Sequence, residues 1–336
     1  MDAARMDRRR TRGRGPPVAR TSRRVRLGSV LMTRLPGTDI TRMTADQITA
    51  ANLRLMRRRR FSGAVLGDLA PGVSYVDRAF AGPAHDVPIR VYTPAGPPRT
   101  RPLILHIHGG GFCLGNLDMD LWLCSRLAAG ADAIVVSVDY RLAPQHPFPA
   151  AVDDCIAALR WVHAHAAELG ADPDDLTVIG ESAGGNLSAV LCLLARDAGG
   201  PSISRQILIY PVVDAAFWTD PANQVVDQPF LTQAQMKVFL RHYLAGQDDA
   251  VTDQRLSPLH AKDLSGLPPA YIVTGTADVL EPEAIRYRDA LRAAGVPVQL
   301  VRYTGQPHGF LNTPGLCPAA RPAMDHIAAF QTHRYG

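Results

Sequence analysis

The chain has 336 residues, which is enough for two average domains or for one large α/β domain that carries an insertion. Hydrophobic residues make up 46% and charged residues 20% of it, which excludes an intrinsically disordered protein, and no run of about 18 apolar residues is present to span a membrane as a helix. The net charge of +5 is unevenly distributed, because residues 1–26 contain ten arginines and two aspartates, a local charge of +8 that leaves −3 for residues 27–336.

Residues 1–35 are predicted to form a basic disordered tail. They contain no aromatic residue and no amphipathic pattern with which to dock on a folded body. A basic arm could contact nucleic acid or anionic lipid, but the missing aromatic residues favour a plain unstructured extension, so we expect no nucleic-acid partner. The apolar stretch 27–32 is shorter than the roughly 7–15 residues of an export signal core.

The cysteines indicate a reducing compartment. Their number is odd, and they are scattered without any Cys-x-x-Cys spacing, which is typical of neither a disulfide framework nor a zinc site. We therefore expect a cytoplasmic protein that holds no metal and no other cofactor. The five cysteines are Cys113, Cys124, Cys155, Cys192 and Cys317.

Short apolar runs alternate with helical patterns from residue 73 onward, and this alternation predicts the fold class. The runs 73–80 and 87–92 flank Gly82-Pro83 and are expected to form an antiparallel pair. Several of the later runs lack the alternation of half-exposed strands, which is typical of strands buried on both faces. They lie at 103–107, 134–138, 176–179, 207–210, 271–274 and 298–301. With intervening helices such as 150–168, the pattern predicts an α/β fold with a mostly parallel sheet covered by helices on both sides.

Two segments stand outside this pattern. Residues 36–68 precede the first strand and include a helical stretch near 44–60. About sixty residues separate Tyr210 from the strand at Tyr271, far more than a helical crossover needs, and they contain a predicted helix at 231–244. Such an insertion is typical either of a lid over the carboxyl edge of the sheet or of an extra packing layer, and the sequence leaves both interpretations open.

The segment GESAGG at 180–185 follows a predicted strand and opens a predicted helix. This is the context of a nucleophile elbow, in which a serine occupies a tight strand-to-helix turn. The flanking residues must be small, because a larger side chain would collide with neighbouring backbone. The helix that begins there directs its positive end toward developing negative charge. We therefore predict that Ser182 is a nucleophile.

A second segment, HGGGF at 108–112, directly follows the predicted strand 103–107. Acyl transfer passes through an oxyanion that preorganised N–H donors must meet, and consecutive glycines let successive amides face one point. We predict that the amides of Gly110, Gly111 and Ala183 are these donors. A phosphate-binding loop would need G-x-G-x-x-G or a following Lys-Ser/Thr, and neither is present. His108 is expected to brace the loop.

A serine hydroxyl needs a base to take its proton, and the base needs an acid to orient it. Asp278 and His308 each follow a predicted strand, in the chain order that α/β-hydrolases use. Glu281 and Glu283 are rival acids, but they lie further into the next helix. The other downstream histidines are expected at the surface or in packing roles: His242, His260, His326 and His333.

A third block, DYRLAPQHPFPA at 139–150, contains three prolines and is expected to form a rigid loop that buttresses the site. Five blocks thus follow one another within about residues 73–315: HGGGF, DYRLAP-x-HPFPAA, GESAGGN, D-x-L and HGF. In this order and spacing they resemble the hormone-sensitive-lipase-like family of serine esterases of the α/β-hydrolase fold. The resemblance implies a catalytic domain at 69–336 with a cap built from helices in 36–68 and an insertion at about 213–258.

The resemblance also implies the roles of the site residues. Ser182 would be the nucleophile, His308 the general base and Asp278 the acid that orients it, with Gly110, Gly111 and Ala183 as the oxyanion hole. The chain is therefore expected to be a cofactor-independent serine carboxylesterase that hydrolyses short- to medium-chain esters through an acyl-enzyme.

Several alternatives remain open. Long-chain lipase, acetyl-hydrolase and amidase activities would use the same triad, because the depth of the acyl pocket depends on how the cap folds. A non-catalytic ligand receptor, like the gibberellin receptors that this family resembles, is disfavoured because those lack a working triad histidine and His308 is present. A homodimer also remains open.

Overall fold

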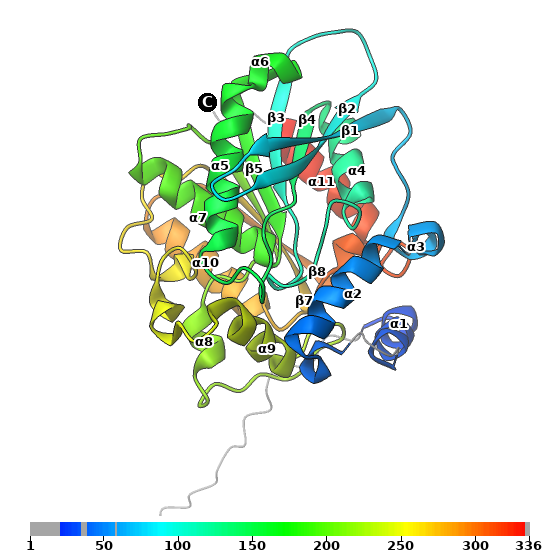
Figure 1. Cartoon of the computed structure of the whole chain (residues 1–336), viewed down its shortest axis with the longest axis vertical. Coiled ribbons are helices and arrows are strands. Elements are labelled where there is room, and N and C mark those ends of the chain that lie inside the picture. The colour runs from blue at the N-terminus through cyan, green and yellow to red at the C-terminus, as the bar shows by residue number, and fades with distance from the viewer. Residues whose placement is uncertain (1–20, 35–38, 58, 333–336) are drawn as a thin grey trace, which may run out of the picture.

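A computed structural model of the chain describes residues 21–34, 39–57 and 59–332, and an eight-stranded sheet runs through the middle of this part (Figure 1). The strands are β1 (Val73–Ala81), β2 (Asp86–Pro94), β3 (Arg101–Ile107), β4 (Ile134–Val138), β5 (Ala171–Glu181), β6 (Arg205–Ile209), β7 (Ala270–Ala277) and β8 (Val298–Pro307). Their order is β1-β2-β4-β3-β5-β6-β7-β8. Strand β2 is antiparallel to β1 and β4, and every other neighbouring pair is parallel. The predicted α/β fold with a mostly parallel sheet is confirmed.

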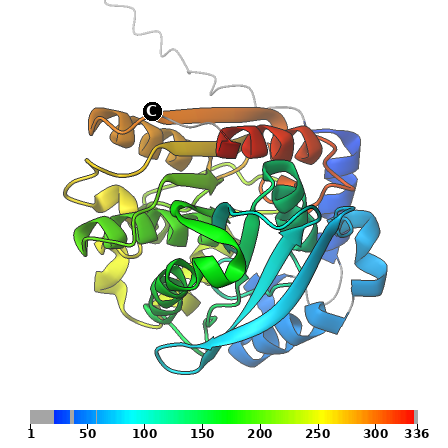
Figure 2. The ribbon, with the colours of Figure 1, turned by 90° about the horizontal axis from the view of Figure 1, so that it is seen from above.

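The central strands, such as β3, β4, β6 and β7, are mostly apolar on both sides because both faces of the sheet are covered there. Successive side chains of a strand point to opposite faces, and Leu103 and Leu105 of β3 enter one hydrophobic core while Ile104 enters the other. In Figure 2 the red α11 lies on the opposite side of the sheet from the green α5 and α7. The helices of one face are α5 (Ala150–Ala164), α7 (Ala183–Asp197) and α10 (Glu281–Ala293), and those of the other are α4 (Leu121–Ala131) and α11 (Ala320–Thr332).

The insertion and the N-terminal segment pack together beyond the carboxyl edge of the parallel strands. Figure 1 shows α2, α8 and α9 at the same end of the molecule. Helix α9 contacts η1, and Ile40 and Ile48 share one hydrophobic core with Leu240 and Tyr243. Helix α9 starts at a capping box formed by Thr232 and its third helical residue. These elements are η1 (Ile40–Arg42), α2 (Ala45–Arg57), α3 (Arg59–Leu66), α8 (Ala215–Thr219), α9 (Gln233–Leu244) and η2 (Asp248–Thr252).

The prediction of a disordered tail at residues 1–35 is wrong for its last part. Residues Arg23–Arg34 form helix α1, and Ser22 caps it by accepting the Val25 amide through its side chain at 3.3 Å. Val25 is only 1% exposed and joins the core that contains α4 and α11, while Gly28 faces the side chain of Leu316. The helix is therefore held by apolar contacts with a distant part of the chain. Residues 1–20 and 35 lie outside the described residues.

The remaining predicted elements are present, but several strands are longer than predicted; for example, β5 covers 171–181 instead of 176–179, and β8 covers 298–307 instead of 298–301. The helix predicted at 150–168 is divided at His165 into α5 and the short α6 (Ala166–Leu169), because His165 leaves the helical conformation. Gly170 ends α6 with a φ of 73°, as a helix stop requires. Two short turns complete the structure, η3 (Pro258–His260) and η4 (Phe310–Asn312). None of the helices in the described ranges has both the length and the apolarity that a membrane crossing would require.

Candidate active site

Ser182 occupies the sharp turn between β5 and α7. Its φ is 58°, a left-handed conformation that is strained for a residue with a side chain. The glycines around it are sterically required: a Cβ atom on Gly180 would lie 2.3 Å from the Gly184 oxygen, and one on Gly184 would lie 1.9 Å from the Ile107 oxygen. The serine amide donates to the Ile209 oxygen at 2.9 Å, which ties the turn to β6. The predicted elbow therefore has the geometry that its sequence indicates.

The serine hydroxyl, an imidazole and a carboxylate form one hydrogen-bonded chain. The Nε2 atom of His308 lies 2.9 Å from Ser182 Oγ, and its Nδ1 atom lies 2.8 Å from Asp278 Oδ2. Asp278 is 5% exposed, and its other oxygen accepts the Leu280 amide at 2.9 Å. The three side chains come from the loops after β5, β7 and β8, whose carboxyl ends meet at one edge because the strands are parallel. An imidazole held in this way is oriented to take the hydroxyl proton.

Three backbone amides near Ser182 have no acceptor in the described part of the chain. Among the described residues, the amides of Gly110, Gly111 and Ala183 donate to no protein acceptor. The values of φ are 117° at Gly110 and 62° at Gly111, a region that favours glycine. A Cβ atom on Gly110 would lie 2.0 Å from the Leu114 oxygen. Gly109 is different, because its amide already donates to Glu181 Oε1 at 2.9 Å. The three remaining amides are suited to bind an oxyanion.

The loop at 108–112 is supported from several sides. The ring of His108 stacks on Tyr140 with centroids 4.2 Å apart, and the Tyr140 hydroxyl donates to the His108 oxygen at 2.8 Å. His108 thus braces the loop, and the block at 139–150 buttresses it, as expected. From the N-terminal segment, Asn52 accepts the Gly115 amide at 2.9 Å. The N-terminal segment and the loop after β4 therefore both hold the loop at 108–112 in place.

The rival acids have other partners. Glu281 pairs with Arg302 at 2.7 Å. Glu283 accepts the Val213 amide at 2.7 Å and the indole N–H of Trp218. In the described part of the chain, no hydrogen bond or ion pair joins either of them to His308, whereas Asp278 Oδ2 lies 2.8 Å from its Nδ1 atom.

The other histidines play packing or surface roles where the structure describes them. His260 contacts Asp214 at 2.9 Å, and His326 contacts the exposed hydroxyl of Tyr303 at 2.8 Å. His242 is half-buried on the cap helix α9. His333 lies outside the described residues.

Sequence reasoning missed a group of buried polar side chains beneath the site. Atoms of His106, Asp120 and Glu181 that could bind a metal lie within 4.8 Å of one another. Both imidazole nitrogens already have protein partners, since Nδ1 contacts Ser137 Oγ and Nε2 contacts Glu181 Oε2, each at 3.0 Å. This occupancy gives no support to a metal site. A signal was present, because His106 interrupts an otherwise apolar strand.

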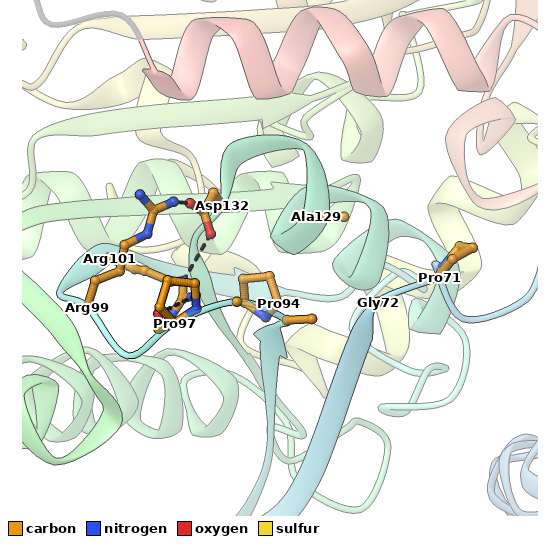
Figure 3. A pocket seen from close by; sticks show the side chains of 10 residues that line it. Pro71, Gly72, Pro94, Pro97, Arg99, Arg101, Ala129 and Asp132 are labelled. Atoms are coloured by element: carbon orange, nitrogen blue, oxygen red, sulfur yellow. Dashed lines mark hydrogen bonds and ion pairs between the residues drawn. The ribbon is translucent and has the colours of Figure 1, made fainter.

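A pocket of about 490 Å³ lies away from this site (Figure 3). It is formed where β2 ends and β3 begins, which is the opposite edge of the sheet from Ser182. Its charged side chains are Arg99, Arg101 and Asp132, and both arginines pair with the one carboxylate, Arg101 at 2.9 Å. No polar group of the predicted triad lines this pocket.

Comparisons with known proteins agree with this geometry. A family model described as alpha/beta hydrolase fold matches residues 104–312. Carboxylesterase NlhH of Mycobacterium tuberculosis is 40% identical over 312 residues, which are 92% of this chain and 95% of that protein. Esterase LipI of the same organism is 42% identical over 260 residues, covering 76% and 80%. The crystal structure of a thermostable esterase from Pseudomonas putida ECU1011 superposes with a TM-score of 0.82 at 31% identity, covering 95% of this chain and 98% of that one.

Proposed function

Because this chain belongs to the α/β-hydrolase family and is a hormone-sensitive-lipase-like serine carboxylesterase, we propose that Ser182, His308 and Asp278 are its catalytic triad. The observation that carries this assignment is the continuous hydrogen-bonded chain from Ser182 Oγ through the imidazole to Asp278. The amides of Gly110, Gly111 and Ala183 form the proposed oxyanion hole.

In the acylation step, Ser182 Oγ attacks the ester carbonyl while His308 Nε2 takes the hydroxyl proton. Asp278 holds the Nδ1–H of the imidazole and stabilises its positive charge. The carbonyl oxygen becomes an oxyanion, which the three free amides meet with hydrogen bonds that are already oriented. The tetrahedral intermediate collapses when the imidazolium gives its proton to the leaving alcohol.

The acyl-enzyme is then hydrolysed by the same groups. Water enters where the alcohol left, and His308 takes a proton from it as the water oxygen attacks the acyl carbon. Collapse of the second intermediate returns the proton to Ser182 and releases the carboxylic acid. The scheme needs no group beyond the side chains and amides of this site.

The acyl preference is proposed to be for short to medium chains. A ring of the cap, that of Phe239, lies directly against Gly111, which limits the space beside the oxyanion hole. Long-chain lipase, acetyl-hydrolase and amidase activities are the alternatives on the same triad. A series of p-nitrophenyl esters from acetate to palmitate, with p-nitroacetanilide as the amide, distinguishes them through kcat/KM.

The decisive variant is Ser182→Ala. It removes the nucleophile and leaves the fold, so we expect turnover of p-nitrophenyl acetate to fall by about a thousandfold or more. The matched control is Ser188→Ala on the same helix, where the hydroxyl donates only to the Gly184 oxygen at 2.8 Å. Undiminished activity in S182A, or equal losses in both variants, would overturn the assignment.

We also propose a cytoplasmic location, which is supported by five cysteines that are all buried with free thiols. The partner is a small-molecule ester, and the charge of −3 on residues 27–336 disfavours nucleic acid. Light scattering of the purified protein would decide between a monomer and a homodimer.

A further inference from the structure

A cluster of buried polar side chains lies beneath the oxyanion loop and is not used by the proposed chemistry. It consists of His106 on β3, Asp120 before α4, Glu181 at the end of β5, and Asn312 on η4; we call it the buried cluster. The first three are between 0% and 2% exposed. Burial of an unpaired charge lowers the stability of the folded state. Such side chains are therefore found together only where they pair their charges and hydrogen-bond with one another.

Glu181 is the centre of the buried cluster. One carboxylate oxygen accepts the Gly109 amide at 2.9 Å, and the other lies 3.0 Å from His106 Nε2. Gly109 directly precedes the proposed oxyanion donor Gly110, and a Cβ atom on it would lie 2.8 Å from the Glu181 backbone oxygen. The oxyanion loop therefore packs directly against the end of β5, which precedes Ser182. The Glu181 side chain fixes the loop at the Gly109 amide.

Asn312 connects Glu181 to the part of the site that contains the proposed base, His308. Its amide nitrogen donates to Asp120 and, at 3.4 Å, to Glu181, while its oxygen accepts the Tyr210 hydroxyl at 2.6 Å. The Tyr210 ring lies against the His308 ring, with centroids 4.7 Å apart. One series of contacts thus joins the oxyanion loop to the loop of the imidazole.

The charges of the buried cluster balance. Burial acts to raise the pKa of Glu181, but the His106 charge and the hydrogen bonds from His106, Asp120 and Gly109 outweigh it, and the net shift of this pKa is downward. Burial and the Glu181 charge raise the pKa of Asp120 above its ordinary value. Burial lowers the pKa of His106, but neighbouring Cys124 and Glu181 outweigh it and the net shift is upward. An ionised Glu181 paired with a protonated His106 leaves little net charge to oppose an oxyanion nearby.

We propose that Glu181 is a positioning residue for ester hydrolysis. It aligns the oxyanion loop through its bond to the Gly109 amide, and through Asn312 it fixes the position of this loop relative to the His308 loop. This inference rests on the proposed triad and oxyanion hole. Because alignment of the donors matters most when the oxyanion forms, Glu181 acts on kcat rather than on KM.

The test compares Glu181→Ala with Glu181→Gln, using p-nitrophenyl acetate. The alanine leaves the Gly109 amide without its acceptor, whereas glutamine keeps a side-chain oxygen at that place. We expect E181A to lower kcat about ten- to a hundredfold while KM changes less than about twofold. The kcat of E181Q should be at least about tenfold higher than that of E181A. The control is Gln206→Ala, which removes a buried polar side chain from β6 that donates only to the Pro268 oxygen.

The inference is overturned if E181A lowers kcat no more than Q206A does, if the loss falls on KM alone, or if E181Q recovers nothing. Should E181A fail to fold by circular dichroism, Asn312→Leu decides: it removes the bridge at a half-buried position, and an unchanged kcat in this variant overturns the inference. S182A is assayed alongside. An active S182A overturns the proposed function as well, whereas an inactive S182A with an unaffected E181A overturns this inference alone.

Discussion

The phenyl ring of Phe239 lies against Gly111, so that a Cβ atom built on this glycine would come within 2.4 Å of the ring. Phe239 belongs to helix α9 of the insertion at about 213–258, while Gly111 belongs to the loop that follows β3. The backbone oxygen of Phe239 also lies 3.8 Å from the thiol of Cys113 in the same loop. The insertion therefore lies directly beside this loop.

Phe239→Ala is expected to move the acyl preference toward longer chains. Removal of the ring opens space beside the proposed oxyanion hole. One additional methylene group bound in such a pocket changes kcat/KM by about tenfold or more. The measurement is the ratio of kcat/KM for p-nitrophenyl octanoate to that for the acetate. The control is Phe217→Ala in the same cap, because that ring contacts Trp218 and Arg286 instead. An unchanged ratio in F239A would refute the prediction.

Asp278→Asn is expected to reduce kcat by about a thousandfold or more while KM changes little. The asparagine fits the same space and still accepts the Leu280 amide, but it cannot stabilise the imidazolium or hold the imidazole in the correct tautomer. Glu281→Gln is the matched control, since Glu281 lies three residues away and pairs with Arg302. If E281Q were as damaging as D278N, the choice between the two acids would be wrong.

Glu283 is expected to make the protein less stable as the pH rises. Burial raises the pKa of Glu283 from about 4.5 to about 8, although bonds from the Val213 amide and the Trp218 indole act in the opposite direction. Between these two values the folded state keeps a proton that the unfolded state releases. The contribution to stability is thus fully present below about pH 4.5 and is lost as the pH rises through about 8.

Urea unfolding between pH 5 and pH 8.5 tests this expectation. The free energy of unfolding of the wild type should fall by up to about 1.4 kcal/mol per pH unit more steeply than that of Glu283→Gln, which cannot titrate. Parallel profiles for the two proteins would contradict the assignment of this slope to Glu283.

Val25→Ala tests whether helix α1 is part of the folded body. Val25 is 1% exposed in the core beside α4 and α11, so the loss of its methyl groups should lower the free energy of unfolding by about 1–2 kcal/mol. Leu27→Ala in the same helix is the control, because Leu27 is 72% exposed and its loss should change little. Equal effects of the two variants would show that α1 is not docked as described.

Features that arise from local steric and hydrophobic constraints were predictable from the sequence. Strands such as 103–107 and 134–138 were recognisable because burial on both faces requires apolar residues at every position. The turn at Ser182 was recognisable because only glycine fits at position 180, where a Cβ atom would lie 2.3 Å from the Gly184 oxygen four residues on. These constraints act within a few residues, so they are visible in short segments.

Features that depend on distant partners needed the tertiary structure. Helix α1 was predicted as disordered because its few apolar residues fold only against a core that includes Leu316 and α11. Spacing favoured Asp278 over Glu281 as the proposed acid, and the contact that supports it, between Asp278 and the imidazole of His308, joins residues thirty positions apart.

Short stretches of the chain were enough to predict the strands, the elbow and the glycine loop, because each shows in the size and polarity of successive residues. That Glu181 accepts the Gly109 amide, and that Asn312 donates to Glu181, became visible only in the folded protein. A polar side chain has the same appearance in a sequence whether it is solvated or buried. Its role follows from the partners that satisfy it, and these are brought together only when parallel strands place their carboxyl ends at one edge.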